Sequence, residues 1–171
     1  MIQLRVLGPL EILVDGAPAP PWLRWRKHAA LLTYLALRGP RPHARDRLVA
    51  LFWPDKPEAD ARHSLNEAVR VIRRAAGPDA LVSGVGDLRL VAGYVECDAD
   101  ELVRFLGDGS AAAATRLIRG QFLEGLKLDD SNEFEQWLDG ERRTWHARMQ
   151  QALLSCSRDA WHRGDATAAA D

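Results

Sequence analysis

The sequence predicts an α+β N-terminal half followed by an all-α C-terminal half. Three observations lead to this division. Apolar and polar residues alternate at the period of a strand near the N-terminus, and from residue 26 the apolar residues recur at helical spacing. The charge changes sign as well: residues 22–76 hold twelve basic and five acidic residues, whereas residues 96–171 hold nine basic and fifteen acidic ones. We therefore expect two domains, spanning residues 1–95 and 96–171.

A small antiparallel sheet is expected first. Residues 2–7 place apolar side chains at every second position, and residues 10–14 repeat this pattern after Gly8-Pro9. Asp15-Gly16 is typical of a turn. The prolines at positions 18, 20 and 21 exclude a central strand, so this segment is expected to be an edge or a loop.

Three helices are expected next, over residues 26–37, 43–53 and 58–76. Gly39-Pro40 ends the first and Pro54 ends the second. Asp55 is the expected N-cap of the third, with a proline in the first turn and Glu58 three residues on. Two short apolar segments, 80–82 and 88–92, then predict a β-hairpin. A sheet, three helices and a terminal hairpin in this order are the plan of a winged helix-turn-helix.

The chain beyond residue 96 is expected to be helical over residues 98–106, 111–118 and 132–162, with a break of the last helix near Asp139-Gly140. Gly164-Asp165 predicts a turn, and the sequence stops a few residues into what would be the next helix. We therefore expect the sequence to be a fragment, with an incomplete second domain.

The third predicted helix separates its residues into an apolar arc and a polar arc. Arginine can fork onto guanine and asparagine onto adenine in the major groove, while further arginines bind phosphates. A merely solvated amphipathic helix would show a similar division, but four arginines against one acid on the polar arc favour DNA recognition. The predicted DNA-reading residues are Arg62, His63, Asn66, Arg70, Arg73 and Arg74.

Other basic residues are expected to bind the DNA backbone. Four of them lie near the starts of the first two helices, where helix N-termini also attract phosphates: Arg26, Lys27, Arg45 and Arg47. Arg89 on the hairpin would enter a minor groove as the wing, although strands often expose an arginine.

Several residues that suggest other chemistry have simpler explanations. The histidines form no close metal-binding pair, and Gly84-x-Gly86 fits a hairpin turn better than a phosphate loop. Asp98, Asp100 and Glu101 lie where a helix begins, and the helix dipole favours acids there. No nucleophile with a base is evident, so we expect neither an enzyme nor a cofactor or metal site.

The two cysteines, Cys97 and Cys156, have no partner at a zinc-ligand spacing and are expected to be buried apolar side chains in a reducing compartment. The N-terminus has no signal-peptide core, and no apolar run approaches the length of a membrane span. We expect a cytoplasmic protein that does not interact with membranes.

The chain resembles the SARP-type transcriptional activators. The resemblance rests on Leu7-Gly8, the segments RKHAALLTYLAL (26–37), RDRLVALFWP (45–54), ARHSL (61–65), IRR (72–74), RGQFLEGL (119–126) and EFEQWL (133–138), and Glu141-Arg142. It implies an OmpR-like winged helix joined to a tetratricopeptide-like bacterial transcriptional activator domain. It departs from the family at Val71-Ile72 and at His63, either of which could alter the sequence that is read.

The resemblance also implies binding to double-stranded DNA at direct repeats, commonly as a homodimer, with recruitment of RNA polymerase. The segment between the second and third helices would touch polymerase through Trp53, Asp55, Lys56 and Glu58, unless Trp53 simply caps the core. Two alternatives stay open: a protein-interaction module with little DNA affinity, and a regulatory fragment of an ATP-hydrolysing signalling protein.

Overall fold

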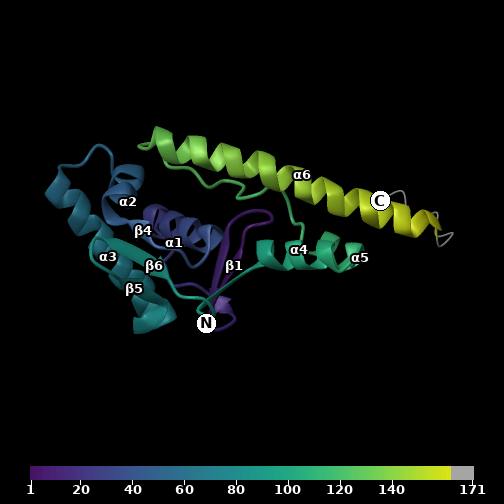
Figure 1. The fold of residues 1–171 in the computed structure, drawn as a ribbon, viewed down its shortest axis with the longest axis horizontal. Helices are drawn as coiled ribbons and strands as arrows, with labels where there is room; N and C mark the ends of the chain where they lie inside the picture. Colours follow the sequence, from purple (N-terminus) through teal and green to yellow (C-terminus); the bar gives the residue numbers. More distant parts are fainter. Residues whose placement is uncertain (163–171) are drawn as a thin grey trace.

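The computed structural model describes residues 1–162, which form an elongated molecule (Figure 1). It consists of a winged helix and a helical part, and the long last helix packs against both. Its winged-helix part contains the predicted α+β arrangement, and the helical part follows it in the chain. The turn expected at Gly164-Asp165 lies outside the described residues. No helix within residues 1–162 combines the length and the apolar character that crossing a membrane requires.

The N-terminal sheet has four strands in the order β3-β2-β1-β7. β1 (Ile2–Arg5) pairs antiparallel with β2 (Glu11–Val14), which pairs with the edge strand β3 (Ala17–Pro18). β7 (Val95–Cys97) pairs parallel with β1, a strand that the sequence pattern does not predict. A strand of three residues is too short to show the alternation of apolar and polar side chains. The strand with which β7 pairs also lies about ninety residues earlier in the chain. The boundary expected at residue 95 thus falls within a strand of the first sheet.

Three helices follow: α1 (Arg26–Arg38), α2 (Arg45–Phe52) and α3 (Glu58–Ala76). The expected start of α2 at residue 43 is wrong, because β4 (His43–Ala44) pairs with the wing instead. The N-cap predicted at Asp55 is wrong too. Pro57 occupies the cap position of α3 and no side chain caps the helix, which leaves Asp55 exposed two residues upstream.

The wing is the predicted hairpin, formed by β5 (Leu81–Ser83) and β6 (Asp87–Leu90) after the short 3-10 helix η1 (Pro78–Ala80). β4 adds a third strand, giving the order β4-β6-β5. The backbone amide of Arg45 donates to the Gly86 carbonyl over 2.9 Å, so the start of α2 is joined to the tip of the wing.

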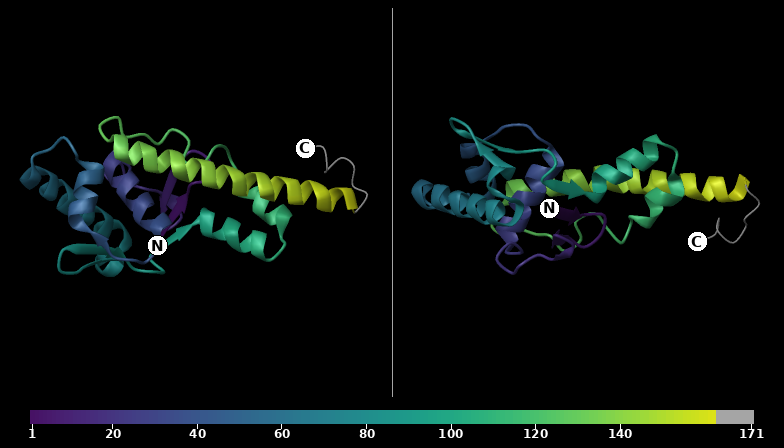
Figure 2. Two further views of the ribbon diagram at one scale, coloured as in Figure 1. Left: turned by 45° about the horizontal axis from the view of Figure 1, so that its top comes forward. Right: turned by 90° about the horizontal axis from the view of Figure 1, so that it is seen from below.

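The C-terminal part consists of α4 (Asp98–Gly107), α5 (Ala111–Arg116) and α6 (Asn132–His162). The break expected near Gly140 is wrong, because α6 is continuous. A single glycine inside a helix costs only about 1 kcal/mol relative to alanine, and α6 packs on both sides of it, against α2 at one end and α5 at the other. Figure 2 shows α6 running from the winged helix along one side of the molecule to its opposite end.

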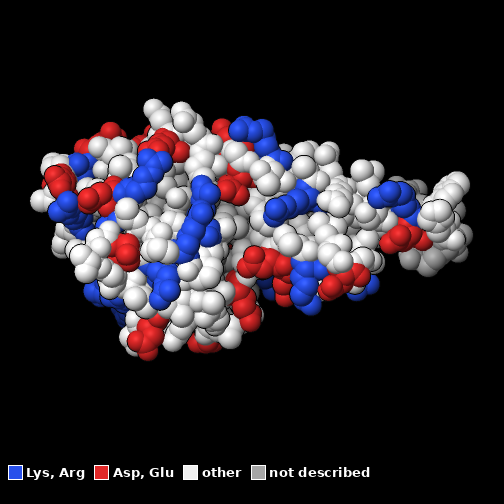
Figure 3. Space-filling model, viewed as in Figure 1, with Lys and Arg blue, Asp and Glu red and all other residues white. Residues whose placement is uncertain are grey.

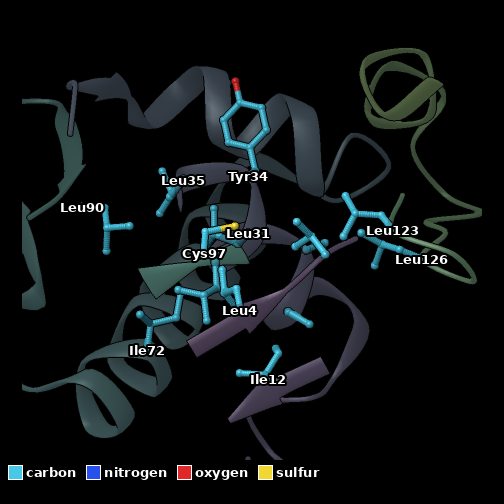
Figure 4. Packing of buried hydrophobic residues seen from close by; sticks show 14 of the residues in the cluster. Leu4, Ile12, Leu31, Tyr34, Leu35, Ile72, Leu90, Cys97, Leu123 and Leu126 are labelled. Atoms are coloured by element: carbon cyan, nitrogen blue, oxygen red, sulfur yellow. The ribbon is translucent and has the colours of Figure 1, made fainter. Parts of the chain in front are cut away.

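One hydrophobic core joins the two parts. Figure 4 shows side chains from β1 and β2, from α1 and α3, and from the wing, with Leu123 and Leu126 of the helical part on the same cluster. Phe134 at the start of α6 is fully buried and its ring lies 5.3 Å from that of Phe52 on α2. The Ser131 hydroxyl, also buried, donates to the Leu51 carbonyl over 2.6 Å and accepts from the Phe134 amide over 3.2 Å. It therefore caps α6 and attaches it to α2.

Backbone hydrogen bonds form a second connection between the two parts. The amides of Arg119 and Leu123 donate to the carbonyls of Leu7 and Val6 over 2.7 and 2.8 Å. The segments approach so closely at Gly8 that a Cβ there would lie 2.9 Å from the Cβ of Arg119. Glycine is required at this position because any side chain would separate the segments.

Asp98, the first residue of α4, strengthens this connection. Its two carboxylate oxygens accept the amides of Val6 and Leu7 over 2.8 and 3.3 Å, and Arg119 lies 3.5 Å away. Burial raises the pKa of Asp98, against the opposite effect of these donors. The acids at the start of α4 therefore have unequal roles: Asp98 joins two parts of the chain, and Asp100 is exposed.

The two thiols are expected to differ in reactivity. Burial raises the pKa of Cys97 to about 12, whereas Cys156 on α6 is only half-buried. Because the thiolate is the reactive form, a disulfide reagent at pH 8 should titrate one thiol quickly in the folded protein and the second only in urea. Cys156→Ser should abolish the fast reaction. Two equally fast thiols in the folded protein would contradict the buried position of Cys97.

Candidate nucleic-acid interface

α3 places its apolar face on α1 and α2 and leaves the opposite face exposed. The predicted apolar arc is buried along most of its length, with Ala75 and Ala76 half-buried at the C-terminal end. The sequence folds this way because apolar residues recur at three- and four-residue spacing, so one stripe of the helix can leave water. The side chains on the exposed face include Arg62, His63, Asn66, Arg70 and Arg74.

Arg70 and Glu67 form a close pair near the middle of this exposed face. The Arg70 Nε lies 3.0 and 3.2 Å from the two carboxylate oxygens of Glu67, and Nη2 lies 2.9 Å from Oε2. The hydrogen bond from Arg70 is the main cause that lowers the pKa of Glu67, and the nearby His63 and His28 act in the same direction. The carboxylate is thus charged at neutral pH and paired with one arginine.

Acidic residues neutralise the N-terminal end of α3. The Arg62 Nη2 lies 2.7 Å from a carboxylate oxygen of Glu58 and 3.1 Å from one of Asp46. Next to this group, Arg45 at the start of α2 donates to the Asn66 side-chain oxygen. Asn66 and Arg45 therefore form a polar link between the first turn of α2 and the exposed face of α3.

The C-terminal end of α3 carries more free positive charge. The Arg74 guanidinium lies over the ring of Trp22, 4.8 Å from its centre. Trp25 is 64% exposed and stacks on His28 at 5.5 Å. These aromatic residues before and within α1 extend the exposed face beyond α3.

Arg73 is directed toward the wing instead of the exposed face. Its Nε and Nη2 donate to the Leu81 carbonyl over 3.0 and 2.7 Å, and Nη2 also donates to the Ser83 hydroxyl over 3.2 Å. The guanidinium is half-buried and holds β5 against α3. Arg73 therefore has a structural role here, whereas the sequence placed it among the DNA-reading residues.

Three of the four expected backbone-binding residues pair with acids of the helical part. Arg26 lies 3.2 Å from Asp129, Lys27 pairs with Asp130, and Arg47 pairs with Glu133 of α6. Of the four residues, Arg45 alone has a hydrogen bond to α3 among the described contacts. The sequence could not indicate this pairing, because the acids lie about ninety residues or more away along the chain.

The wing exposes Arg89, which lies opposite Val82 across the hairpin. Val85 at the tip is fully exposed, and Gly86 beside it adopts a positive φ of 81° that suits glycine. The arginine and the apolar tip therefore project from the same hairpin next to α3.

The segment between α2 and α3 contains both buried and exposed members of the expected polymerase-contacting group. Trp53 is only 4% exposed, and its ring centre lies 5.9 Å from that of Phe52. It therefore caps the core, which was the alternative to a polymerase contact. Asp55, Lys56 and Glu58 are exposed, and the Lys56 ammonium lies 2.9 Å from the Ser64 hydroxyl.

Basic and acidic side chains alternate over the winged helix in the view of Figure 3, and acids gather at the start of α4. Within residues 1–162, no three His, Cys, Asp or Glu side chains are placed to hold a metal ion. The exposed face of α3, which carries three arginines and Asn66, and the adjacent wing with Arg89 form the candidate interface.

Comparison with known proteins identifies regulators that resemble the chain as a whole. No family model matches the chain. The transcriptional regulatory protein MoaR1 of Mycobacterium bovis is 30% identical over 183 residues, an alignment that covers 92% of this chain and 57% of MoaR1. The transcriptional regulatory protein EmbR of Mycobacterium tuberculosis is 25% identical over 178 residues, covering 92% of this chain and 45% of EmbR. Both of these relatives are named as transcriptional regulatory proteins.

The solved structure of M. tuberculosis EmbR in complex with a low affinity phosphopeptide has a TM-score of 0.74 and 23% identity, and covers 98% of this chain and 47% of EmbR. This match confirms the fold class, a winged helix followed by a helical part. The chain spans about half the length of the curated relatives that it matches. These relatives are regulators and not enzymes, in agreement with the expectation from the sequence.

Proposed function

We propose that this chain is the DNA-binding part of a transcriptional regulator and that it reads duplex DNA through the exposed face of α3. The observation that supports this proposal is the division of α3, which buries its apolar side and presents Arg62, Asn66, Arg70 and Arg74 on the other. An α-helix fits the major groove of B-DNA, and these side chains match the donors and acceptors of base edges there.

Each exposed residue has a distinct proposed role. Arg70, near the middle of the face, forks onto a guanine, and Asn66 binds an adenine. Arg62, His63 and Arg74 flank them toward the groove walls. Arg45 binds a phosphate beside the first turn of α2, and Arg89 of the wing enters the adjacent minor groove. Arg26, Lys27 and Arg47 are left out, because they do not lie on the exposed face of α3 and pair with acids of the helical part.

We further propose that the connection between α2 and α3, together with the first residue of α3, contacts RNA polymerase through the exposed side chains of Asp55, Lys56 and Glu58. A homodimer on direct repeats would place two such segments on one side of the DNA. In this proposal the two domains act together in a bacterial cytoplasm, with residues 1–95 reading DNA and the helical residues from 96 onward orienting it.

Selection from a genomic fragment library, followed by binding measurements over a salt series, tests the DNA-reading function. Enrichment of a short repeated motif, with affinity that falls steeply as salt rises, would support a sequence-reading regulator. Salt-dependent binding without enrichment would indicate a general DNA binder. No binding at low salt would contradict the proposal and favour the protein-interaction module.

Arg70→Ala is expected to weaken binding to the selected operator by about 1–3 kcal/mol, because a bidentate contact to guanine is lost. Arg26→Ala is the matched control. It removes the same charge from a side chain that pairs with Asp129, so operator affinity should change by less than about 0.5 kcal/mol. Equal effects of the two variants would mean that charge alone governs binding and that the assignment of the DNA-reading face is wrong.

A further inference from the structure

Glu67 is the acid at the centre of the exposed face of α3, and the DNA-reading function leaves it without a role. The other acids of α3, Glu58 and Asp60, lie in the first turn. A free carboxylate here would repel DNA phosphates and would weaken binding to every sequence. The pairing of Glu67 therefore matters for what Arg70 can do.

The hydrogen bonds specify which edge of the Arg70 guanidinium is occupied. Glu67 accepts from Nε and from Nη2, so it takes the side edge of the guanidinium. A guanidinium has five N–H donors in a fixed planar fork. Both N–H donors of Nη1 and the second one of Nη2 have no part in this pair. The end of the fork, formed by one donor from each of these nitrogens, is thus left available.

This remaining edge suits guanine. In the major groove guanine presents two acceptors, O6 and N7, and arginine commonly binds them through two parallel donors. An arginine with an unrestrained side chain must lose its rotamer freedom on forming that contact. Because the fork of Arg70 is held by a carboxylate on the same helix, less freedom is lost when the contact forms.

We propose that Glu67 is a positioning residue that holds Arg70 so that the end of its guanidinium selects one guanine of the operator. The proposal rests on the DNA-reading function proposed above. In this role Glu67 weakens the attraction to DNA of any sequence and strengthens the discrimination at one base pair. The hydrogen bond from Arg70 is the main cause that lowers the pKa of Glu67, so the pairing itself favours the charged carboxylate.

Glu67→Gln tests the proposal, because glutamine keeps the size of the side chain and removes the charge. Binding to random-sequence duplex DNA should tighten by a few fold. The preference for guanine at the position that depends on Arg70 should fall by about tenfold, within the range of a bidentate contact. In an Arg70→Lys background the same change should leave the preference at that position unaltered, since lysine presents no fork.

Asp46→Asn is the matched control. Asp46 is an exposed acid of α2 that pairs with an arginine of α3, Arg62. Its replacement should tighten binding to random DNA to a similar extent and leave the Arg70-dependent guanine preference unchanged.

Two results would overturn the positioning role. The first is an unchanged guanine preference in Glu67→Gln, which would mean that the pair is only a surface ion pair. The second is an altered preference at a neighbouring cytosine with guanine selection intact, which would mean that Glu67 itself contacts a base. Failure of the proposed function is distinguishable, because the wild-type chain would then enrich no sequence at all.

Discussion

Replacing Phe134 by alanine is expected to lower the free energy of unfolding of the whole chain by about 3–5 kcal/mol. The ring is fully buried and lies between Phe52 at 5.3 Å and Trp137 at 5.1 Å. Its removal would leave a cavity where α6 rests on α2, in a core that the winged helix and the helical part share. Urea unfolding followed by both circular dichroism and tryptophan fluorescence measures the effect.

The matched control is Leu154→Ala on the same helix. Leu154 is 64% exposed, so its replacement should change the free energy of unfolding by less than about 0.5 kcal/mol. The two spectroscopic signals should give coincident transitions, because a single core unfolds as one unit. A loss below about 1 kcal/mol for Phe134→Ala, or two separate transitions, would contradict the shared core.

Asp98→Ala is expected to cost about 3 kcal/mol of stability. Its carboxylate accepts the backbone amides of Val6 and Leu7 and faces Arg119. Removing it would leave two partly buried N–H groups without an acceptor, and each such loss costs about 1–3 kcal/mol. Asp98→Asn should be destabilising too, because an amide can accept only one of the two bonds and places an NH₂ group against the other donor. Thermal unfolding of both variants measures these losses.

Asp100→Ala is the comparison that isolates the role of position from that of charge. Asp100 lies in the same first turn of α4 and is exposed. Its removal takes away only a favourable interaction with the helix dipole, worth less than about 1 kcal/mol. If Asp98→Ala and Asp100→Ala were equally destabilising, the connection between α4 and residues 6–7 would not contribute to folding.

The connections at Asp98 and Phe134 affect how the two domains can be treated. β7 belongs to the first sheet by hydrogen bonding and leads directly into α4. A cut at residue 95 would remove most of β7, the acceptor of the Val6 and Leu7 amides, and the covering of Phe52. We therefore expect the winged helix to be most stable when the helical part accompanies it.

Elements with a strong local pattern were predictable from the sequence. α3 is the clearest example, because its apolar residues recur over nineteen positions and its ends are marked by Pro57 and Gly77. The wing followed from two apolar segments around glycines. β4 and β7 have two and three residues, so no periodicity could reveal them, and their existence depends on partners elsewhere in the chain.

The candidate interface divides in the same way. The exposed positions of Arg62, Asn66 and Arg70 follow from helical periodicity alone. The inward turn of Arg73 toward Leu81 and the pairing of Arg26 with Asp129 do not. From the sequence alone, a charged side chain is expected to be exposed. Only its neighbours in the folded chain decide whether its hydrogen-bond donors are already occupied.

The sequence by itself determined which segments form helices, which face of α3 is apolar, and that basic residues gather before residue 77 and acidic ones after residue 95. These properties are local, because hydrophobic periodicity and charge are written in consecutive residues. Only the tertiary structure decided which basic groups stay unpaired, which carboxylate holds Arg70, and how closely the two parts are joined. Hydrogen bonds and ion pairs are short-ranged, so they depend on distances between residues that the chain brings together only when it folds.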